Sequence, residues 1–281
     1  MLARAKVNLY LHVLGRRADG YHDLDSLVVF ADVGDLVEVR PADTWRLAVT
    51  GPFAGALRSV ADNDNLAMRA ARLLLREAGR DQALEIRLDK CIPLGAGFGG
   101  GSADAAAVLH ATNRCLQLGY STADLQSVGL ALGADVPVCV HGGPAYFGGI
   151  GEVVTAVVLP PLHLCLAWPG VGLATAAVFR DAEPHADVER AATPRSFADV
   201  VTMMQGTTND LVARAEDLLP VIKDVLAALM RQRGCAAARM SGSGSGCFGI
   251  FADTAAAAAA AQALRAEHAA WWTATATTLP E

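Results

Sequence analysis

The chain has 281 residues, of which 53% are hydrophobic, and carries a formal net charge of −6 at pH 7. Its basic residues form no block, so neither nucleic acid nor a membrane is expected as the main partner, because both require a concentrated positive face. No apolar stretch has the length and character of a membrane-spanning helix. The length suits one large domain or two smaller domains that share a cleft.

The spacing of cysteines and histidines argues against a structural metal centre. The six cysteines never approach a Cys-x-x-Cys spacing, and the seven histidines are scattered, with no His-Glu-x-x-His motif. A zinc site is therefore not expected. The chain begins without the charged and apolar regions of a signal peptide, which favours reduced thiols and a cytoplasmic location.

In the first half of the chain the hydrophobic pattern predicts strands interspersed with helices. Apolar and polar residues alternate from Lys6 to His12, which is typical of a strand. Further strands are predicted at residues 24–30, 36–40, 46–50, 84–88 and 136–140. Helices are predicted at residues 65–78, where Gly79 provides the stop, and at residues 102–116 and 122–132.

The pattern of predicted strands and helices changes near residue 150, where the second half of the chain begins. Its predicted strands are residues 152–158, 162–167, 237–241, 247–251 and 271–278. Its predicted helices lie near residues 200–204, 210–215 and 218–233, with an alanine-rich helix after residue 251, and the polar stretch from Asp181 to Pro194 is the least structured part. We expect an α+β fold of two domains, residues 1–150 and 151–281, with a ligand in the cleft between them.

The segment from Gly95 to Gly101 has five glycines in seven positions. Such a backbone leaves its N–H groups uncovered, so that phosphate oxygens can approach closely. A helix that starts at Ser102 would add free N–H groups and a positive dipole end. Asp104, in the first turn of that helix, would compensate the dipole or contact the metal of ATP. These features predict a phosphate-binding loop and favour an ATP-dependent small-molecule kinase.

Other interpretations of this glycine loop fit less well. A Walker A loop needs a lysine near its end, and no lysine lies between Lys90 and Lys223. Gly95, Gly97 and Gly100 match the Gly-x-Gly-x-x-Gly dinucleotide motif, but no acidic residue closes a strand about 20 residues further on. A turn without a ligand is disfavoured by the conformational entropy that the glycines lose on folding.

A second glycine cluster extends from Ser241 to Gly246, between two predicted strands. By itself it is equally consistent with a loose hairpin turn. Together with the first loop, it could instead close over a phosphate group or over the substrate from the other half of the chain.

Three separated segments resemble the three motifs of the GHMP kinases, the family of galactose, homoserine, mevalonate and phosphomevalonate kinases. These segments are AKVNL at residues 5–9, PLGAGFGGGSADAA at 93–106 and SGSGSGCF at 241–248. Further segments are similar to the family members whose substrate is an alcohol carrying a cytidine diphosphate group: GRRADGYHDLDSLV at 15–28, DNL at 64–66, LGADVP at 132–137, GIGE at 149–152 and TNDL at 208–211. The resemblance covers nearly the whole chain and implies a two-domain GHMP kinase fold with the active site between the domains.

The resemblance implies a catalytic pair. Asp135 matches the aspartate that accepts the proton of the attacking hydroxyl, and Lys6 matches the lysine that supports it. A cation there would keep the carboxylate ionised and stabilise the charge on the transferred group. Without the motif, capping of a helix would be the simpler role for Asp135, and a solvated position on an edge strand the simpler one for Lys6.

The resemblance also implies the binding residues, with ATP and Mg²⁺ as cofactors. For the substrate these are Asn8, Tyr21, His22, Phe179, Gly242, Ser243 and Gly244. For ATP they are Asn65, Pro93, Leu94, Gly95, Ala96, Gly97, Phe98, Gly99, Gly100, Gly101, Ser102 and Ala103. Metal ligands and oligomeric state are left unassigned.

Several of these binding residues have a simpler alternative. An aromatic ring can stack on cytosine while a histidine reads its edge, but Tyr21 and His22 could be surface residues and Phe179 core. Asn65 could instead be a helix N-cap. A kinase for homoserine or mevalonate, which needs no base-stacking site, and a nucleotide-binding module without catalysis are the alternative functions.

Overall fold

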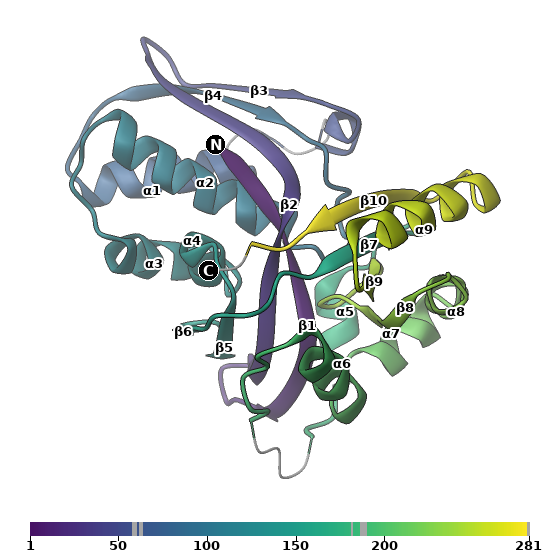
Figure 1. Ribbon diagram of the computed structural model, residues 1–281. Helices are drawn as coiled ribbons and strands as arrows, with labels where there is room; N and C mark the ends of the chain where they lie inside the picture. The colour runs from purple at the N-terminus through teal and green to yellow at the C-terminus, as the bar shows by residue number, and fades with distance from the viewer. Residues whose placement is uncertain (58–60, 62–63, 181, 186–189, 280–281) are drawn as a thin grey trace. The chain divides into compact units, whose positions relative to one another are not determined.

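The computed structural model describes residues 1–57, 61, 64–180, 182–185 and 190–279 (Figure 1). The chain folds into two compact units, each made of three chain segments. The first unit consists of Met1–Ala5, Val33–Leu94 and Gly99–Gly142, and the second of Lys6–Asp32, Gly95–Phe98 and Gly143–Glu281. Strands β1 (Leu2–Arg16) and β2 (His22–Ala42) and the glycine loop each pass through both units. The domain boundary near residue 150 stays a prediction.

The first unit combines strands with helices. The short strand β3 (Arg46–Thr50) pairs in parallel with β4 (Ala83–Asp89), and β4 pairs antiparallel with the last part of β2, where Leu36 lies opposite Asp89. The helical segments are η1 (Ala54–Leu57), α1 (Leu66–Glu77), α2 (Gly100–Cys115), α3 (Thr122–Leu130) and α4 (Val136–His141). Helix α2 packs against α1, α3 and α4, with α1 beside it in Figure 1.

Helix α1 illustrates how the sequence specifies these elements. Asn65 precedes the helix, and its side-chain oxygen accepts a hydrogen bond from the N–H of Ala67 at 2.9 Å, which confirms the N-cap alternative for this residue. Apolar residues recur at helical spacing and form one buried stripe, which includes Met68 and Leu74. The predicted helix at residues 65–78 is therefore confirmed.

The strand predicted at residues 136–140 is wrong, because these residues form helix α4. The five apolar residues in a row give no periodicity that separates a buried strand from a buried helix. All five are buried, and Pro137 is tolerated because it stands in the first turn, where its missing N–H group costs nothing.

The second unit contains an antiparallel sheet of four strands in the order β10–β7–β9–β8. These strands are β7 (His163–Trp168), β8 (Cys235–Met240), β9 (Cys247–Phe251) and β10 (Trp272–Thr277). Helices α8 (Val221–Met230) and α9 (Thr254–Glu267) pack against this sheet (Figure 1). The predicted strands and helices of this region are confirmed, with shifts of a few residues at their ends.

Two further strands of the second unit extend the first part of β2. Strand β5 (Ala145–Gly149) pairs antiparallel with residues 24–28 of β2 and with β6 (Val153–Ala156). The remaining helices of the unit are α5 (Thr175–Phe179), α6 (Phe197–Gly206) and α7 (Val212–Leu218). Near its middle, β2 also forms a single bridge between Ala31 and Thr278. Strand β5 and helix α5 were not predicted from the sequence.

The α+β fold class is confirmed by this mixture of helices and largely antiparallel strands. Part of the polar stretch from Asp181 to Pro194 lies outside the described residues, and its described part carries no helix or strand. No helix of the described residues combines the length and the apolar character needed to cross a membrane.

The core of the first unit can be tested with one pair of substitutions in α1. Leu74 is fully buried, so Leu74→Ala should lower the free energy of unfolding by about 2–5 kcal/mol, through lost burial and a residual cavity. Its neighbour Leu73 is only half-buried, so Leu73→Ala should cost clearly less. Urea denaturation followed by circular dichroism measures both, and equal losses would show that the buried stripe of α1 is misassigned.

Candidate active site

The glycine loop runs from Pro93 into helix α2, and its backbone has φ angles that residues other than glycine rarely adopt. Gly95, Gly97 and Gly99 have φ values of 65°, 71° and 67°, in the left-handed region. A Cβ atom on Gly97 would lie 2.1 Å from the carbonyl oxygen of Ser241. Glycine is therefore required at Gly97 both by the backbone angle and by the approach of a second chain segment.

The second chain segment is the other glycine cluster. The N–H of Gly246 donates to the carbonyl of Ala96 at 2.9 Å, and the N–H of Ser245 donates to the carbonyl of Gly95 at 3.3 Å. The hydroxyl of Ser241 donates to the carbonyl of Gly97 at 3.0 Å. The second cluster does connect strands β8 and β9 as a turn, and that turn is hydrogen-bonded to the first glycine loop rather than loose.

Phe98 and Gly99, the next residues of the glycine loop, anchor the loop and lead into helix α2. The side chain of Phe98 is 1% exposed and packs against Trp272 with ring centroids 6.0 Å apart, so any contact of Phe98 with ATP would come from its backbone. Gly99 is the N-cap residue of α2, which begins at Gly100, two residues before the predicted start at Ser102. The first N–H groups of a helix have no carbonyl partner within it, so this turn presents donors suited to a phosphate group.

Strand β1 carries Lys6 and Asn8 on one face beside these loops. The backbone N–H of Lys6 donates to the carbonyl of Phe98 at 2.9 Å. The side chain of Lys6 is 2% exposed, and its ammonium lies 5.1 Å from the centroid of the Phe147 ring. The alternative of a solvated lysine on an edge strand is therefore wrong.

Asn8 is fully buried and is connected to the glycine clusters through Ser241. Its backbone N–H donates to the Ser241 hydroxyl at 3.2 Å, and its side-chain amide donates to the Ser26 hydroxyl at 2.9 Å. Its side-chain oxygen has no hydrogen-bond partner among the described residues. A buried acceptor without a partner is costly, and a donor supplied by a ligand would remove that cost.

His22 and Phe179, predicted to form a base-binding site, come together in the second unit. Their ring centroids are 5.4 Å apart, and the rings are tilted by 37°. Nε2 of His22 is buried without a hydrogen-bond partner among the described residues, and burial lowers the pKa of this imidazole. Phe179 is only half-buried, which argues against the core alternative, while Tyr21 is 57% exposed.

Helix α5 carries Phe179 at its end and Thr175 at its start. The Thr175 hydroxyl lies 3.0 Å from that of Ser243, the middle residue of the predicted Gly242–Gly244 site. The short helix therefore connects the second glycine cluster to the pair formed by His22 and Phe179.

Asp135 stands immediately before α4, in the first unit. It occupies the N-cap position, but its side chain makes no capping hydrogen bond, so capping does not describe its role. Lys6 belongs to the second unit. The pairing of Lys6 with Asp135 stays a prediction.

A buried ion-pair cluster lies at the start of α2. The ammonium of Lys90 donates to Asp104 Oδ2 at 2.7 Å and to Asp35 Oδ2. From the sequence we expected Asp104 to compensate the helix dipole or to contact the metal of ATP. The structure supports neither role, because the carboxylate of Asp104 is buried against a lysine. Asp35, 55 residues before Lys90 in the chain, left no sequence signal for this cluster.

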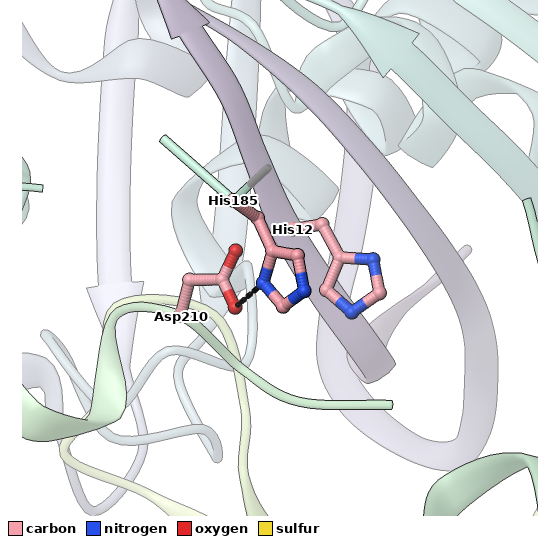
Figure 2. Close-up of side chains that lie close together, drawn as sticks. All are labelled: His12, His185 and Asp210. Carbon is pink, nitrogen blue, oxygen red and sulfur yellow. Dashed lines mark hydrogen bonds and ion pairs between the residues drawn. The ribbon is translucent and has the colours of Figure 1, made fainter. Parts of the chain in front are cut away.

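Two of the scattered histidines also meet, next to Asp210 (Figure 2). The rings of His12 and His185 stack with centroids 4.7 Å apart, and Nδ1 of His185 bonds Asp210 Oδ1 at 3.0 Å. The candidate ligand atoms of His12, His185 and Asp210 lie within 4.8 Å of one another. Around a zinc ion with bonds of 2.0–2.2 Å, neighbouring ligand atoms would be about 3.5 Å apart.

Structural hydrogen bonds already occupy the carboxylate of Asp210. It accepts the N–H of Val13 at 2.9 Å and the hydroxyl of Thr208. The three side chains therefore fit an anchor for the end of β1 better than a metal centre. A cavity of about 540 Å³ opens beside the two histidines, between the chain at residues 191–194 and helix α6.

The sequence missed two positioning residues at this site. Ser241 bonds both Asn8 and Gly97, and the side-chain amide of Asn209 donates to the carbonyls of Met240 and Gly242 at 2.9 and 2.8 Å. Both residues lie within motifs that the sequence does show, SGSGSGCF and TNDL. Their roles depend on which backbone atoms face them, which a motif does not reveal.

Comparison with known proteins identifies matching families over both halves of the chain. Residues 65–143 match the model of the GHMP kinases N terminal domain, and residues 189–270 match that of the GHMP kinases C terminal. A curated protein of Paramagnetospirillum magneticum, named 4-diphosphocytidyl-2-C-methyl-D-erythritol kinase, is 46% identical over 96% of this chain and 95% of its own. A protein of the same name from Cereibacter sphaeroides is 49% identical over 97% and 96%.

Solved structures agree with these relatives. A crystal structure of 4-(cytidine 5'-diphospho)-2C-methyl-D-erythritol kinase superposes with a TM-score of 0.77 at 35% identity and covers 98% of both chains. A homoserine kinase from Cytophaga hutchinsonii has a TM-score of 0.70 at 19% identity, over 98% of this chain and 95% of its own, and shares the fold alone.

Two substitutions in the glycine loop test its backbone geometry. Gly97→Ala places a Cβ against the Ser241 carbonyl at a positive φ, so it should displace the loop and weaken ATP binding by about 100-fold. Gly101→Ala meets no atom within 4 Å, so the fold should keep its melting temperature. If phosphate approaches the start of α2 closely, Gly101→Ala should still weaken ATP binding. Calorimetric titration with ATP and thermal unfolding distinguish these effects, and ATP affinity unchanged in both variants would contradict the assignment of the loop.

Proposed function

Because this chain belongs to the GHMP kinases and, within them, to the family of 4-diphosphocytidyl-2-C-methyl-D-erythritol kinases, we propose that it transfers the γ-phosphoryl group of ATP to the 2-hydroxyl of that alcohol. The products are ADP and the 2-phosphate, in the non-mevalonate route to isoprenoid precursors. A cytoplasmic location belongs to the same proposal and is supported by six free cysteines.

The observation that best supports this function is the junction of the two glycine clusters with β1. The Ser241 hydroxyl accepts from Asn8 and donates to Gly97, so the phosphate loop and the lysine strand are held in one arrangement. Phosphoryl transfer has little covalent chemistry for the protein to perform, and catalysis consists mainly of positioning and charge stabilisation. A rigid junction of this kind serves that requirement.

In the proposed reaction Asp135 and Lys6 act on the acceptor hydroxyl. The carboxylate of Asp135 accepts the hydroxyl proton as the oxygen attacks the γ-phosphorus, and the leaving group is ADP. The ammonium of Lys6 stabilises the negative charge of the attacking oxygen and of the transferred group. These roles rest on the match of both residues to the family motifs.

The nucleotide is proposed to bind with its phosphates at the glycine loop and the start of α2. Mg²⁺ accompanies it in this proposal, because the ion neutralises charge between the phosphates and prefers oxygen ligands. The only side-chain oxygen in residues 95–103 is that of Ser102. Ser102 is half-buried in the first turn of α2, which fits a ligand to the ion better than the buried Asp104 does.

The cytidine group is proposed to bind at His22 and Phe179. The ring of Phe179 offers a stacking surface, and the buried Nε2 of His22 offers a hydrogen bond that no described residue supplies. Tyr21, exposed next to His22, would cover the other face of the base. Homoserine and mevalonate need no such surface, so this pair distinguishes the proposed substrate from those of related kinases.

An acceptor comparison tests the function directly. The purified protein should form ADP from ATP with 4-diphosphocytidyl-2-C-methyl-D-erythritol, and much more slowly with homoserine or mevalonate. A coupled ADP assay measures all three rates. Comparable rates with the three alcohols, or ADP formation from none of them, would overturn the proposal.

Asp135→Asn tests the catalytic base, because the amide keeps the size of the side chain but cannot accept the proton as a carboxylate does. Turnover should fall by about 100-fold to 10,000-fold, while ATP binding measured by calorimetry stays near that of the wild type. Asp217→Asn, an exposed carboxylate on α7, is the matched control and should leave turnover unchanged. Near-normal turnover of Asp135→Asn would refute the role of the base.

Phe179→Ala tests the base-stacking surface. Loss of the ring should raise KM for the cytidine-bearing substrate by about 10-fold or more, which corresponds to roughly 1–2 kcal/mol of lost stacking, with little change in KM for ATP. Phe179→Tyr keeps a stacking ring and should retain most of the affinity. Steady-state kinetics with each substrate varied in turn measures both values. A rise in KM for ATP alone would place Phe179 at the nucleotide instead.

A further inference from the structure

Arg239, on strand β8, is a charged side chain of the second unit to which the proposed reaction gives no role. It is half-buried, and its guanidinium donates four hydrogen bonds, all to carbonyl or hydroxyl oxygens. Burial lowers the pKa of Arg239 to about 10 while Asp210 opposes the shift, so the side chain is charged at neutral pH. Removing a cation from water is costly, and these hydrogen bonds compensate for that cost.

Three of the four hydrogen bonds hold the end of helix α6. Nη2 donates to the carbonyl of Met204 and, at 2.6 Å, to that of Thr207, and Nη1 donates to the Thr207 hydroxyl at 3.1 Å. The last carbonyls of a helix have no partner within it, and the helix dipole favours a cation at this end. Capping of α6 alone would therefore be a purely structural role for Arg239.

The fourth hydrogen bond connects Arg239 to the strand that carries the proposed catalytic lysine. Nη1 donates to the carbonyl of Leu9, on β1, at 2.6 Å. Leu9 directly follows Asn8, whose backbone N–H donates to the hydroxyl of Ser241, two residues after Arg239. The end of β8 and the turn that follows it thus hold two consecutive residues of β1, the first through its N–H and the second through its carbonyl.

The segment after α6 holds the next part of β1. The N–H of Leu11 donates to the carbonyl of Thr208 at 3.0 Å, and the N–H of Asp210 donates to the carbonyl of Leu11 at 2.9 Å. Arg239 binds Thr207, immediately before this segment, so its side chain fixes the spacing between β1, β8 and the end of α6. The rigid fork of a guanidinium binds all these oxygens at once, which one ammonium on a flexible stem cannot do.

We propose that Arg239 is a positioning residue for phosphoryl transfer, which holds β1 by the carbonyl of Leu9. Lys6 and Asn8 thereby keep a fixed place beside the second glycine cluster. Arg239 acts through the backbone of β1 and not on the substrate itself. The inference rests on the proposed function in one respect, that Lys6 acts on the acceptor hydroxyl.

Displacement of β1 should slow the transfer step more than it weakens binding. A misplacement of about 1 Å in a catalytic group can lower the rate about 100-fold. In the proposed function, cytidine is bound at His22 and Phe179, and ATP at the glycine loop and the start of α2. Loss of the hydrogen bond to Leu9 should therefore lower kcat with little change in either KM, the opposite of the effect expected for Phe179→Ala.

Arg239→Lys and Arg239→Gln test the inference through steady-state kinetics of the full chain with ATP and 4-diphosphocytidyl-2-C-methyl-D-erythritol. Lysine keeps a cation at the end of α6 but lacks the fork that reaches β1 as well, and glutamine removes the charge too. We expect kcat to fall by about tenfold or more in Arg239→Lys and further in Arg239→Gln. Both KM values should stay within about threefold of those of the wild type.

Leu264→Ala is the control for stability. Leu264 is fully buried on α9 in the same unit, so its truncation should lower the melting temperature without displacing β1. Its kcat, measured well below the melting temperature and referred to folded protein, should equal that of the wild type. A purely structural Arg239 predicts the same behaviour for the Arg239 variants. Thermal unfolding followed by circular dichroism gives the melting temperatures and the folded fraction.

Thr207→Val is the control for the contact with α6. Valine has the shape of threonine but lacks the hydroxyl, so the variant loses one hydrogen bond of Arg239 at α6 and keeps the one to Leu9. It should have a normal kcat. A fall in kcat as large as that of Arg239→Lys would assign the effect to α6 and overturn the inference.

The remaining outcomes separate this inference from the proposed function. A normal kcat in folded Arg239→Lys would overturn the inference and leave the proposed function standing, and so would an equal fall of kcat in Leu264→Ala. If Arg239→Gln does not fold, Arg239→Lys decides alone. If the wild type forms no ADP with this alcohol, the proposed function fails, and this inference with it.

Discussion

The fold of the candidate site depends on one close backbone contact, between Gly97 of the first glycine loop and Ser241 of the second glycine cluster. A side chain at Gly97 would begin 2.1 Å from the Ser241 carbonyl oxygen, so the two segments approach more closely than any other residue would allow. Backbone hydrogen bonds from Ser245 and Gly246 to the first glycine loop surround this contact. Both glycine-rich segments are thus explained by their mutual packing as well as by access for a ligand.

The contact also fixes residues that lie outside both loops. The Ser241 hydroxyl accepts a hydrogen bond from the backbone N–H of Asn8, and the carbonyl of Phe98 accepts one from the backbone N–H of Lys6. Strand β1 is therefore attached to the two loops at Lys6 and Asn8, which lie two residues apart on one face of the strand. Thr175 extends the arrangement to α5 and thereby to Phe179. The glycine loop, strand β1 and helix α5 are therefore linked through hydrogen bonds of the second glycine cluster.

The sequence predicted those parts of the structure that local pattern determines. Strand β9 was predicted with its observed limits, because aromatic and β-branched residues are bounded on both sides by turn residues. The apolar run after Asp135 was assigned as a strand and is a helix, because a run buried on every side carries no periodicity. For the site, motifs identified Lys6, Asn8, His22 and Phe179, and the last two are brought together as expected.

Other parts of the site could not have been predicted from one sequence. Lys90 meets Asp35 across 55 residues and Asp104 across 14, and nothing in their local sequence signals that they share one buried space. The role of Ser241 depends on the carbonyl of Gly97, an atom that every residue possesses. Tertiary hydrogen bonds to backbone atoms leave no mark in a sequence pattern, so positioning residues were missed where motif residues were found.

The passage of β1 and β2 through both units has a consequence for how the protein is made. Ala31, in the middle of β2, forms its bridge with Thr278, and Asp32 accepts a hydrogen bond from the N–H of Thr277, 245 residues later. A ribosome that adds about 5–20 residues per second needs on the order of 10 to 50 seconds to reach that partner. During this time the early strand, rich in apolar residues, waits with an incomplete edge. The pairing of β2 is therefore completed in stages: β4 and β5 reach its two ends first, and its middle gains its bridge only with the last residues of the chain.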